Sequence, residues 1–316
     1  MDKQPVLSIC IPIYNRIEFL RRHFEQFIKN KELFSEKIHL YVSDNCSKDD
    51  LQSLVKEYSS KGLNIEYSRN SENIGPDGNF IKCFNSAKGK YIWLLGSDDI
   101  PVDGFIERLV DILEKNEYGY VFLDNYRDDK KVIEYNDAGE ILQRINVWIT
   151  FMSANIFKTE FVKNVRGEDY MGTYLIQVPY FLEGIVAGQT NAVINYSWIQ
   201  EGSDYANNGG YNYFQVFCAN LLNIVKDFVL SKRLPKRVYH SFKKSLYIKH
   251  FVRFLYEFTI RKRAGNNMDI SHAWSIVAKF YWYNLYFYLF PFIILTILIR
   301  GKLRIVLQKY KKYSYK

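Results

Sequence analysis

The chain has 316 residues, of which 48% are hydrophobic and 17% aromatic, enough for one large domain with an appendage or for two small domains. Residues 1–231 carry 24 Lys and Arg against 32 Asp and Glu, a net charge of −8, whereas residues 232–316 carry 19 against 2, a net charge of +17. This basic, aromatic tail favours an anionic membrane surface over nucleic acid as its partner. The four cysteines lie far apart in no metal-binding pattern, which favours a reducing cytosol and excludes a disulfide scaffold.

Strands and helices alternate from the N-terminus to about residue 126, where the spacing is typical of repeated βαβ units. We expect strands over residues 6–13, 38–44, 64–69, 91–95 and 120–126, and helices over residues 18–30, 48–61, 79–90 and 102–115. This order predicts an α/β fold with a mixed, mostly parallel sheet flanked by helices. Further along, we expect a hairpin turn at residues 136–139 and mixed or edge strands within 151–157 and 190–198.

The predicted strand that begins at Tyr91 leads directly into two adjacent carboxylates, Asp98 and Asp99. Open parallel sheets bind their ligands at the carboxyl ends of the strands. Two carboxylates at such a place repel each other unless a cation compensates them, which indicates a divalent metal that arrives with a phosphate ligand. A helix cap is the alternative, because Asp is favoured there and Pro101 can open the next helix.

Three other polar clusters follow predicted strands or precede predicted helices. They are Pro12, Tyr14 and Asn15 where the first strand ends, Asp44 at the tip of the second, and Asn73, Gly75 and Asn79 in the loop at residues 71–78 and the first position of the helix after it. Asp44 is placed to accept hydrogen bonds from a uracil imide or a ribose hydroxyl, and glycine lets the backbone approach a ligand closely. Singly, each cluster also fits a helix cap or an ordinary turn.

The tail contains two segments of membrane-like composition. Residues 232–263 carry eleven basic residues against one acid, with an apolar stripe at Val238, Phe242, Leu246, Phe251, Leu255 and Phe258. They predict a basic amphipathic helix on a membrane, with a helix packed on the body as the alternative. Residues 280–299 carry no charge and, as one helix, would be roughly 30 Å long, but Pro291 interrupts them. A full span, a re-entrant or interface-lying helix and a buried helical lid all remain open.

These motifs, in this order on consecutive strands, resemble glycosyltransferase family 2, the inverting enzymes with the GT-A fold. The resemblance covers about residues 5–126, is faint to about residue 200 and is absent from the tail. Within the family, the chain is similar to bacterial surface-polysaccharide transferases of the abequosyl- and rhamnosyltransferase type. The resemblance implies a GT-A domain over residues 1–231, with a donor half at about 5–126 and an acceptor half at about 127–231. Residues 232–316 would then form a helical membrane-associating region.

The resemblance also implies roles for residues. The nucleotide-diphosphate sugar would be bound by Pro12, Tyr14, Asn15, Asp44, Asn73, Gly75, Asn79, Ser97 and Asp98, and a Mn or Mg ion by Asp98 and Asp99. Gly96 replaces the first Asp of the family's Asp-x-Asp motif, so Asp99 or Ser97 would substitute for it and metal dependence would be weaker. The family's catalytic base belongs to a late Glu-Asp pair, for which Asp169 is our choice and Glu168 and Glu183 are the alternatives.

The expected function is inverting transfer of a sugar to a polyprenyl-linked saccharide in O-antigen or capsule synthesis, at the cytoplasmic face of the bacterial membrane. A catalytically inactive, membrane-bound nucleotide-sugar binding or scaffold protein is the main alternative, because the first Asp is missing. A dinucleotide enzyme would need a Gly-x-Gly-x-x-Gly motif after the first strand, which the chain lacks. Downstream, the aromatic residues Trp198, Tyr205, Tyr211 and Tyr213 fit either a mobile loop that stacks on sugars or a plain linker.

Overall fold

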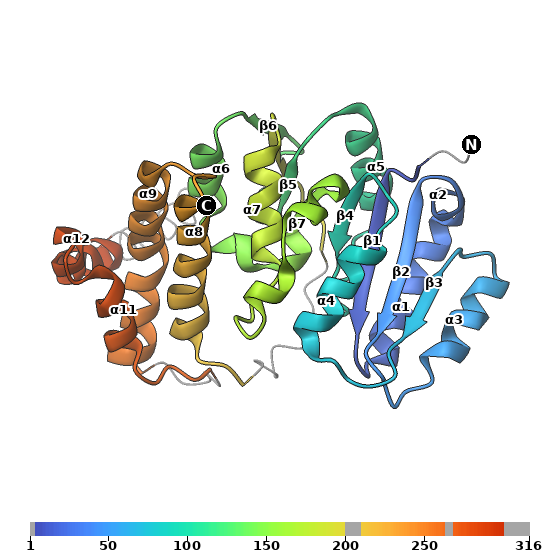
Figure 1. The fold of residues 1–316 in the computed structure, drawn as a ribbon, viewed down its shortest axis with the longest axis horizontal. Coiled ribbons are helices and arrows are strands. Elements are labelled where there is room, and N and C mark those ends of the chain that lie inside the picture. Colours follow the sequence, from blue (N-terminus) through green and yellow to red (C-terminus); the bar gives the residue numbers. More distant parts are fainter. Residues whose placement is uncertain (1–3, 200–209, 263–267, 300–316) are drawn as a thin grey trace, which may run out of the picture.

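The computed structural model describes residues 4–199, 210–262 and 268–299. Within these residues, eight strands form one sheet in the order β3-β2-β1-β4-β7-β5-β8-β6 (Figure 1). The strands are β1 Leu7–Ile13, β2 Ile38–Asp44, β3 Glu66–Arg69, β4 Tyr91–Leu94, β5 Tyr120–Asp124, β6 Val132–Tyr135, β7 Asn155–Lys158 and β8 Asn191–Asn195. The pairs β3–β2, β2–β1, β1–β4 and β5–β8 are parallel and the others antiparallel, so the predicted mixed, mostly parallel sheet is confirmed.

Strand β1 is the centre of the N-terminal half of the sheet. All seven of its residues are buried, and it pairs along its length with β2 and over four residues with β4. Runs of apolar residues of this kind are typical of strands that are covered on both faces. Because β1, β2 and β4 are parallel, their carboxyl ends meet at one edge of the sheet, which brings the predicted polar clusters together.

Four helices lie within four residues of their predicted positions: α1 Ile17–Phe27, α3 Leu51–Ser60, α4 Gly75–Ser86 and α5 Phe105–Lys115. Helices α2 Lys31–Glu36, α6 Ala138–Ile145, α7 Val178–Ala187 and α8 Leu221–Leu230 were not predicted. Helices α4 and α7 contact strands of the two halves of the sheet and cover the face seen in Figure 1. Helix α4 begins four residues earlier than predicted, because proline is well suited to a first helical turn and Pro76 stands there.

The region after residue 127 differs from the prediction at one turn. The expected hairpin turn at residues 136–139 is wrong, since Asp137 caps helix α6 by accepting a hydrogen bond from the Glu140 backbone N–H at 3.0 Å. The prediction failed because Asp followed closely by Gly is typical of a turn, but the same residues also occur where an Asp caps a helix. Strand β6 pairs with β8 instead, and β7 inserts antiparallel between β4 and β5.

The basic helix of the tail is present but faces the protein. It comprises α9 Lys236–Leu246, a π-helical turn Tyr247–Phe251, α10 Val252–Leu255 and a second π-helical turn Tyr256–Ile260. Helix α9 packs against α6 and α8, and five of the six stripe residues, Val238, Phe242, Leu246, Phe251 and Leu255, are buried. The prediction that this stripe inserts into lipid is therefore wrong, because packing on the body removes the same apolar surface from water.

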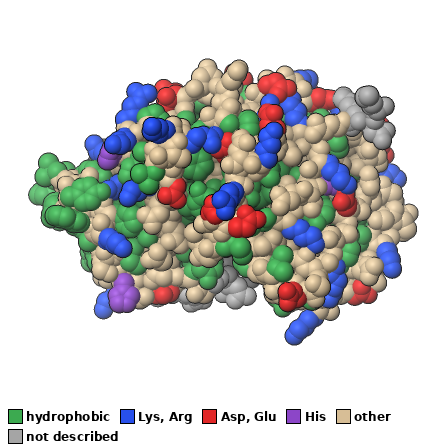
Figure 2. Space-filling view, viewed as in Figure 1, with side chains coloured by type: hydrophobic (Ala, Val, Ile, Leu, Met, Phe, Trp, Pro, Cys, Tyr) green, Lys and Arg blue, Asp and Glu red, His purple; other side chains and the backbone are tan. Residues whose placement is uncertain are grey.

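The uncharged run at residues 280–299 is not one continuous helix. Helix α11 Ala273–Tyr281 ends inside it, a turn follows, then α12 Leu285–Tyr288, and residues 290–299 are again helical. In the described part of the chain, no helix combines the length and the apolar character that a membrane crossing requires. Hydrophobic side chains nevertheless gather at this end of the molecule (Figure 2), and Leu285, Tyr288, Phe292 and Leu295 are all more than half exposed.

Candidate functional site

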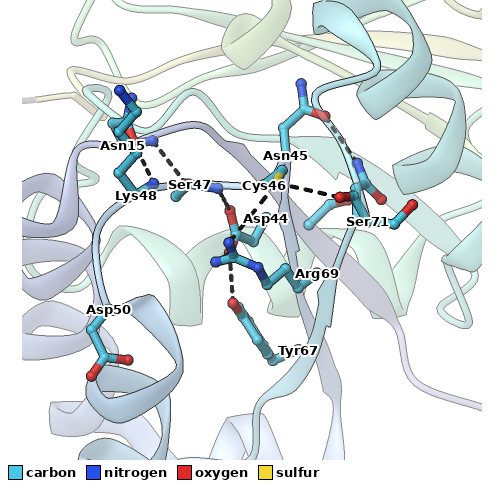
Figure 3. A network of polar contacts seen from close by, with 12 residues as sticks. Asn15, Asp44, Asn45, Cys46, Ser47, Lys48, Asp50, Tyr67, Arg69 and Ser71 are labelled. Atoms are coloured by element: carbon cyan, nitrogen blue, oxygen red, sulfur yellow. Dashed lines mark hydrogen bonds and ion pairs between the residues drawn. The ribbon is translucent and has the colours of Figure 1, made fainter.

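The turn after β1 is fastened to the turn after β2. Asn15 and Arg16 both have positive φ, at 51° and 96°, a left-handed conformation that ordinary side chains seldom adopt. The Asn15 backbone N–H donates to Ser47 Oγ at 2.8 Å, and the Asn15 side-chain oxygen accepts from the Lys48 N–H at 2.8 Å (Figure 3). Tyr14 stays 43% exposed beside this turn, while Pro12 is buried inside β1.

Asp49 caps helix α1 from the neighbouring loop. Its Oδ2 accepts hydrogen bonds from the backbone N–H groups of Arg16 at 2.8 Å and Ile17 at 3.0 Å. A carboxylate at a helix N-terminus is favourable because it satisfies free donors and complements the helix dipole. The sequence analysis missed this residue, since Asp49 belongs by sequence to the segment before α3 and reaches α1 only in the folded chain.

Asp44 ends β2 and is fully buried. Its Oδ1 accepts from the Ser47 N–H at 2.8 Å, and its Oδ2 accepts from the Tyr67 hydroxyl at 2.6 Å and from Arg69 Nη1 at 3.2 Å (Figure 3). Tyr67 and Arg69 share one face of β3 because they are two residues apart. Contact of Asp44 with a base or a ribose stays a prediction, and a ligand there would also meet Arg69, whose side chain is 45% exposed.

The loop before α4 is held by amide side chains. Asn73 Oδ1 accepts from Asn45 Nδ2 at 2.8 Å and from the Gly75 N–H at 2.9 Å, and Gly75 has φ 75°. Asn79 is buried, with its Oδ1 accepting from Ser43 Oγ at 2.7 Å and its Nδ2 donating to the Ser43 carbonyl at 3.0 Å. Asn79 therefore ties α4 to β2, and its amide is engaged by the protein instead of facing a ligand as expected.

Arg16 connects the tip of β1 to the acidic loop after β4. Its Nη1 lies 3.3 Å from Ser97 Oγ and 3.5 Å from Asp98 Oδ1. The Asp98 side chain is 36% exposed, so its carboxylate is accessible from solvent at the same edge of the sheet. Arg16 directly follows Asn15 in the sequence, and its place in that motif is the signal that could have identified it.

The second carboxylate, Asp99, turns inward. It accepts a hydrogen bond from the Ser153 hydroxyl, and Ser153 Oγ in turn accepts from the Gly96 N–H at 2.8 Å. Burial, with a smaller contribution from the neighbouring Asp98 carboxylate, raises the pKa of Asp99 to about 6 although the hydrogen bond from Ser153 opposes the shift. A Cβ at Gly96 would lie 2.7 Å from Asp99 Oδ2, so Asp99 fills the space that a side chain at residue 96 would need. No local pattern links Ser153 to this loop, so sequence reasoning missed it.

His23 supports the acidic loop from inside the protein. The ring is fully buried on α1, and its Nε2 lies 3.2 Å from the Gly96 carbonyl and 3.1 Å from the Ser97 carbonyl. Burial lowers the pKa of His23 to about 4, so the ring is neutral at physiological pH and donates one proton to these two acceptors. His23 thereby fixes the backbone from which Asp98 projects.

The carboxylates suit a divalent cation that is shared with a phosphate ligand. The described residues include no group of three or more His, Cys, Asp and Glu that could hold a metal ion alone. Mg²⁺ needs only one or two carboxylates when phosphates supply further oxygens, and Asp98 presents such a carboxylate. Because Asp99 accepts a hydrogen bond from Ser153, Asp98, whose side chain is 36% exposed, is the better placed of the two predicted metal ligands.

The three candidates for the catalytic base lie outside the loops after β1, β2 and β4. Asp169 and Glu168 are exposed in a 3₁₀ turn at Gly167–Tyr170, and Asp169 pairs with Arg166 at 3.5 Å. Glu183 is buried on α7 and accepts from Asn164 at 2.9 Å and from Arg233 at 2.6 Å. Asp169 and Glu183 line a cavity of about 310 Å³ between α7 and α8, to which no residue of the loops after β1, β2 and β4 contributes.

Comparison with known sequences identifies the N-terminal half and part of the second. The family model described as "Glycosyl transferase family 2" matches residues 8–176. The abequosyltransferase RfbV of Salmonella typhimurium is 40% identical over 95 residues, 30% of this chain and 28% of that protein. The GalNAc(5)-diNAcBac-PP-undecaprenol beta-1,3-glucosyltransferase of Campylobacter jejuni is 30% identical over 120 residues, 37% of each chain. The chain thus spans well under half the length of these two relatives.

Solved structures share the fold at low sequence identity. Residues 1–349 of S. aureus TarS align with a TM-score of 0.62 at 15% identity, covering 82% of this chain and 76% of that one. The mannosyltransferase PcManGT of Pyrobaculum calidifontis, solved with GDP-Man and Mn²⁺, aligns with a TM-score of 0.53 at 14% identity, covering 92% of this chain and 86% of that one. The mixed sheet flanked by helices is therefore the fold of these proteins.

Proposed function

This chain belongs to glycosyl transferase family 2, and on that premise we propose that it transfers a sugar from a nucleotide-diphosphate sugar to a saccharide acceptor with inversion at the anomeric carbon. The contact between Arg16 and the Ser97–Asp98 loop is the observation that carries the proposal. It joins a guanidinium and an accessible carboxylate at the carboxyl ends of two parallel strands, where ligands of open sheets bind. A guanidinium is well suited to phosphate oxygens.

In this proposal, the chain binds the donor through the loops after β1, β2 and β4. Asp98 would hold a Mn or Mg ion, which neutralises charge on the departing diphosphate when it is bound. Arg16 would contact the same phosphates, and Tyr14, Asn15 and Asp44 lie on the two neighbouring strand ends that would receive the nucleoside. Structures of TarS with UDP-GlcNAc and of PcManGT with GDP-Man and Mn²⁺ share this fold, which supports a nucleotide-sugar donor.

For the acceptor, we propose a lipid-linked saccharide in bacterial surface-polysaccharide synthesis. The name of the Campylobacter jejuni relative places an undecaprenol-diphosphate saccharide in its reaction, and the Salmonella typhimurium relative is an abequosyltransferase. Direct attack by the acceptor hydroxyl inverts the anomeric centre and needs a base within hydrogen-bond reach of that hydroxyl. Asp169 remains our choice for this base.

We further propose that the face formed by Leu285, Tyr288, Phe292 and Leu295 rests on the cytoplasmic face of the cell membrane. An exposed apolar patch of this kind is unusual on a protein surface and is typical of an interaction site. The tail is strongly basic, with 19 Lys and Arg against 2 Asp and Glu over residues 232–316, which suits anionic lipid. This face takes the place of the apolar stripe on α9 and α10 as the proposed membrane contact, because that stripe is buried.

Substitution of Asp98 by Asn tests the proposed enzyme against the inactive scaffold that the sequence also allowed. We expect the parent to release nucleotide diphosphate from a nucleotide sugar in the presence of acceptor lipid and Mn²⁺, and Asp98→Asn to lower the rate by about 100-fold or more. Thermal unfolding of both proteins controls for folding. If the parent binds nucleotide sugar but shows no turnover with any donor and acceptor pair, the scaffold alternative holds and the transferase proposal is wrong.

A further inference from the structure

A second cavity opens at the end of β5, outside the loops that the donor proposal uses. Its volume is about 300 Å³, and it lies between three segments: the end of β5, the junction after α6 and the π-helical turn at Tyr247–Phe251. Strand β5 is parallel to β4, with β7 between them. The cavity therefore opens at the same edge of the sheet as the Asp98 loop, two strand spacings or about 10 Å along it.

Two exposed aromatic rings stand on the rim of this cavity. Tyr126 is 74% and Trp148 is 42% exposed, and their ring centroids are 5.0 Å apart. Large aromatic side chains usually bury most of their surface, so an exposed pair of this kind leaves apolar ring faces in water. The aliphatic face of a sugar ring is a suitable partner for such a surface.

The charges around the cavity are mainly positive. Asp124 is buried and accepts a hydrogen bond from Arg144, so each neutralises the other. Arg127 and Lys249 add two exposed cations to the lining. The histidine of the lining, His250, is hydrogen-bonded to the Tyr213 hydroxyl, and burial lowers its pKa to about 4, so it is uncharged near neutral pH. The net charge of the lining favours an anionic group.

Asn146 provides a polar group without a protein partner. It is 6% exposed, its Nδ2 donates to Ser245 Oγ at 3.1 Å, and its Oδ1 has no hydrogen-bond partner among the described residues. A buried acceptor that is left unsatisfied costs free energy, which a ligand hydroxyl would recover by donating to it. Asn146 also holds a positive φ of 51°, a strained backbone that concentrates at functional positions.

The geometry points to a saccharide-phosphate site in this cavity. The sugar ring lies on Tyr126 and Trp148, a hydroxyl donates to Asn146 Oδ1, and a phosphate or diphosphate on the sugar is bound by Arg127 and Lys249. This inference rests on the proposed function, since within it the occupant is the acceptor. The same phosphate chemistry belongs to a free glycosyl phosphate and to a sugar that is linked to lipid through diphosphate.

Calorimetric titration of the full chain tests the site without depending on catalysis. The probes are hexose and N-acetylhexosamine 1-phosphates, their methyl glycosides and inorganic phosphate. We expect at least one glycosyl phosphate to bind more tightly than its methyl glycoside. Trp148→Ala is expected to weaken both by about 3- to 10-fold, and Arg127→Ala is expected to weaken only the phosphorylated sugar, by about 10-fold. Trp274→Ala and Lys56→Ala, which alter an exposed Trp and Lys elsewhere, are the matched controls and are expected to leave binding unchanged.

The outcomes separate this inference from the donor proposal. Absence of glycosyl phosphate binding, or binding that is insensitive to both Trp148→Ala and Arg127→Ala, overturns the saccharide-phosphate site. If glycosyl phosphates bind as expected but no nucleotide sugar binds or turns over, the proposed function fails and the site remains. A final probe, a short-chain prenyl-diphosphate sugar, identifies the natural ligand. If it binds at least about 10-fold more tightly than the 1-phosphate and Lys249→Ala abolishes the difference, the ligand is the lipid-linked sugar. If the two affinities are equal, the ligand is the free glycosyl phosphate.

Discussion

The loops after β1, β2 and β4 and the cavity beyond β5 lie on the same edge of one sheet, but they are assembled in different ways. In the first region, polar side chains such as Asn15, Asp44 and Asp49 bond to neighbouring loops, and nearly all participants lie within the first hundred residues. In the second, the lining comes from residues as distant as Asp124 and His250, and aromatic rings stay exposed. A binding region made of local motifs can be predicted from the sequence, whereas a binding region assembled by packing can be recognised only once the fold is known.

The largest expected effect tests whether a third place, the cavity between α7 and α8 that Asp169 lines, contributes the catalytic base to the reaction. Asp169→Asn should lower kcat by about 100- to 10,000-fold if Asp169 takes the acceptor proton, with unchanged unfolding, because the side chain is exposed. Glu183→Gln is the matched comparison, since loss of its buried pair with Arg233 should lower the free energy of unfolding by about 2 kcal/mol. Retention of full activity in Asp169→Asn would mean that the base lies outside this cavity.

The first region can be disturbed at the residue that departs from the family motif. Gly96→Asp should lower turnover about 100-fold, because the new side chain would displace Asp99 and the backbone that carries Asp98. Overpacking should also reduce the free energy of unfolding by about 1–3 kcal/mol. The double variant Gly96→Asp with Asp99→Gly relieves the collision and is expected to recover part of the activity. A fully active Gly96→Asp protein would contradict the assigned role of Asp99 in filling this space.

Substitution of Arg16 tests whether the contact between the ends of β1 and β4 contributes to donor binding. Arg16→Ala should weaken nucleotide-sugar binding by about 10- to 100-fold, because it removes a guanidinium from beside Asp98. Arg16→Lys keeps the charge but not the fork-shaped donor set, so an intermediate loss is expected. Arg22→Ala alters an exposed Arg on α1, the helix that Arg16 precedes, and serves as the control in calorimetric titrations. Equal affinities for parent and Arg16→Ala would remove Arg16 from the donor site.

Exposed apolar residues of the tail provide a test of the proposed membrane contact. Phe292→Asp combined with Leu295→Asp should reduce binding to anionic vesicles by about 10-fold or more, because two exposed apolar side chains become charged. Leu230→Asp, at another exposed leucine on α8, is the control. Sedimentation with vesicles of increasing anionic lipid content is the measurement. If the double variant still sediments like the parent, this face does not contact the membrane.

The smallest expected effect is on pH dependence. The pKa of Asp99 is raised to about 6 in the folded protein, so the folded state holds this proton more tightly than the unfolded state does. The stabilisation from the proton is therefore complete below about pH 4 and is lost as the pH rises to about 6. Asp99→Asn should remove this slope from the free energy of unfolding measured between pH 4 and 7. A slope that is unchanged in the variant would contradict the raised pKa.

Sequence reasoning succeeded where local chemistry determines structure. Strand runs such as Leu7–Ile13 and the polar residues after them predicted the sheet edge, because buried parallel strands are continuously apolar. Ser153 could not be predicted at the acidic loop, since its position depends on β7 inserting antiparallel between β4 and β5. The same limit applies to His23, which lies on α1 but bonds to backbone carbonyls after β4.

Aromatic residues show the limit most clearly. Trp198 and Tyr213, which composition allowed as sugar-stacking residues, are buried in the core, where Trp198 donates to the Leu123 carbonyl and Tyr213 stacks on Phe254. Tyr211 is half-buried beside Tyr174, and Tyr205 lies outside the described residues. Tyr126 and Trp148 carried no sequence signal but remain exposed. Composition does not distinguish an aromatic residue that packs in the core from one that contacts a ligand, because both are apolar.

The short segment from Trp148 to Ser153 has a consequence for how the two substrates bind. Its first residue stands on the rim of the cavity beyond β5, and its last bonds to Gly96 and Asp99. A ligand that moves or rigidifies one end of this six-residue stretch changes the energy of the other end, and such coupling is reciprocal. We therefore expect saturation with one substrate to change the dissociation constant of the other by the same factor in both directions, so that the two substrates bind cooperatively.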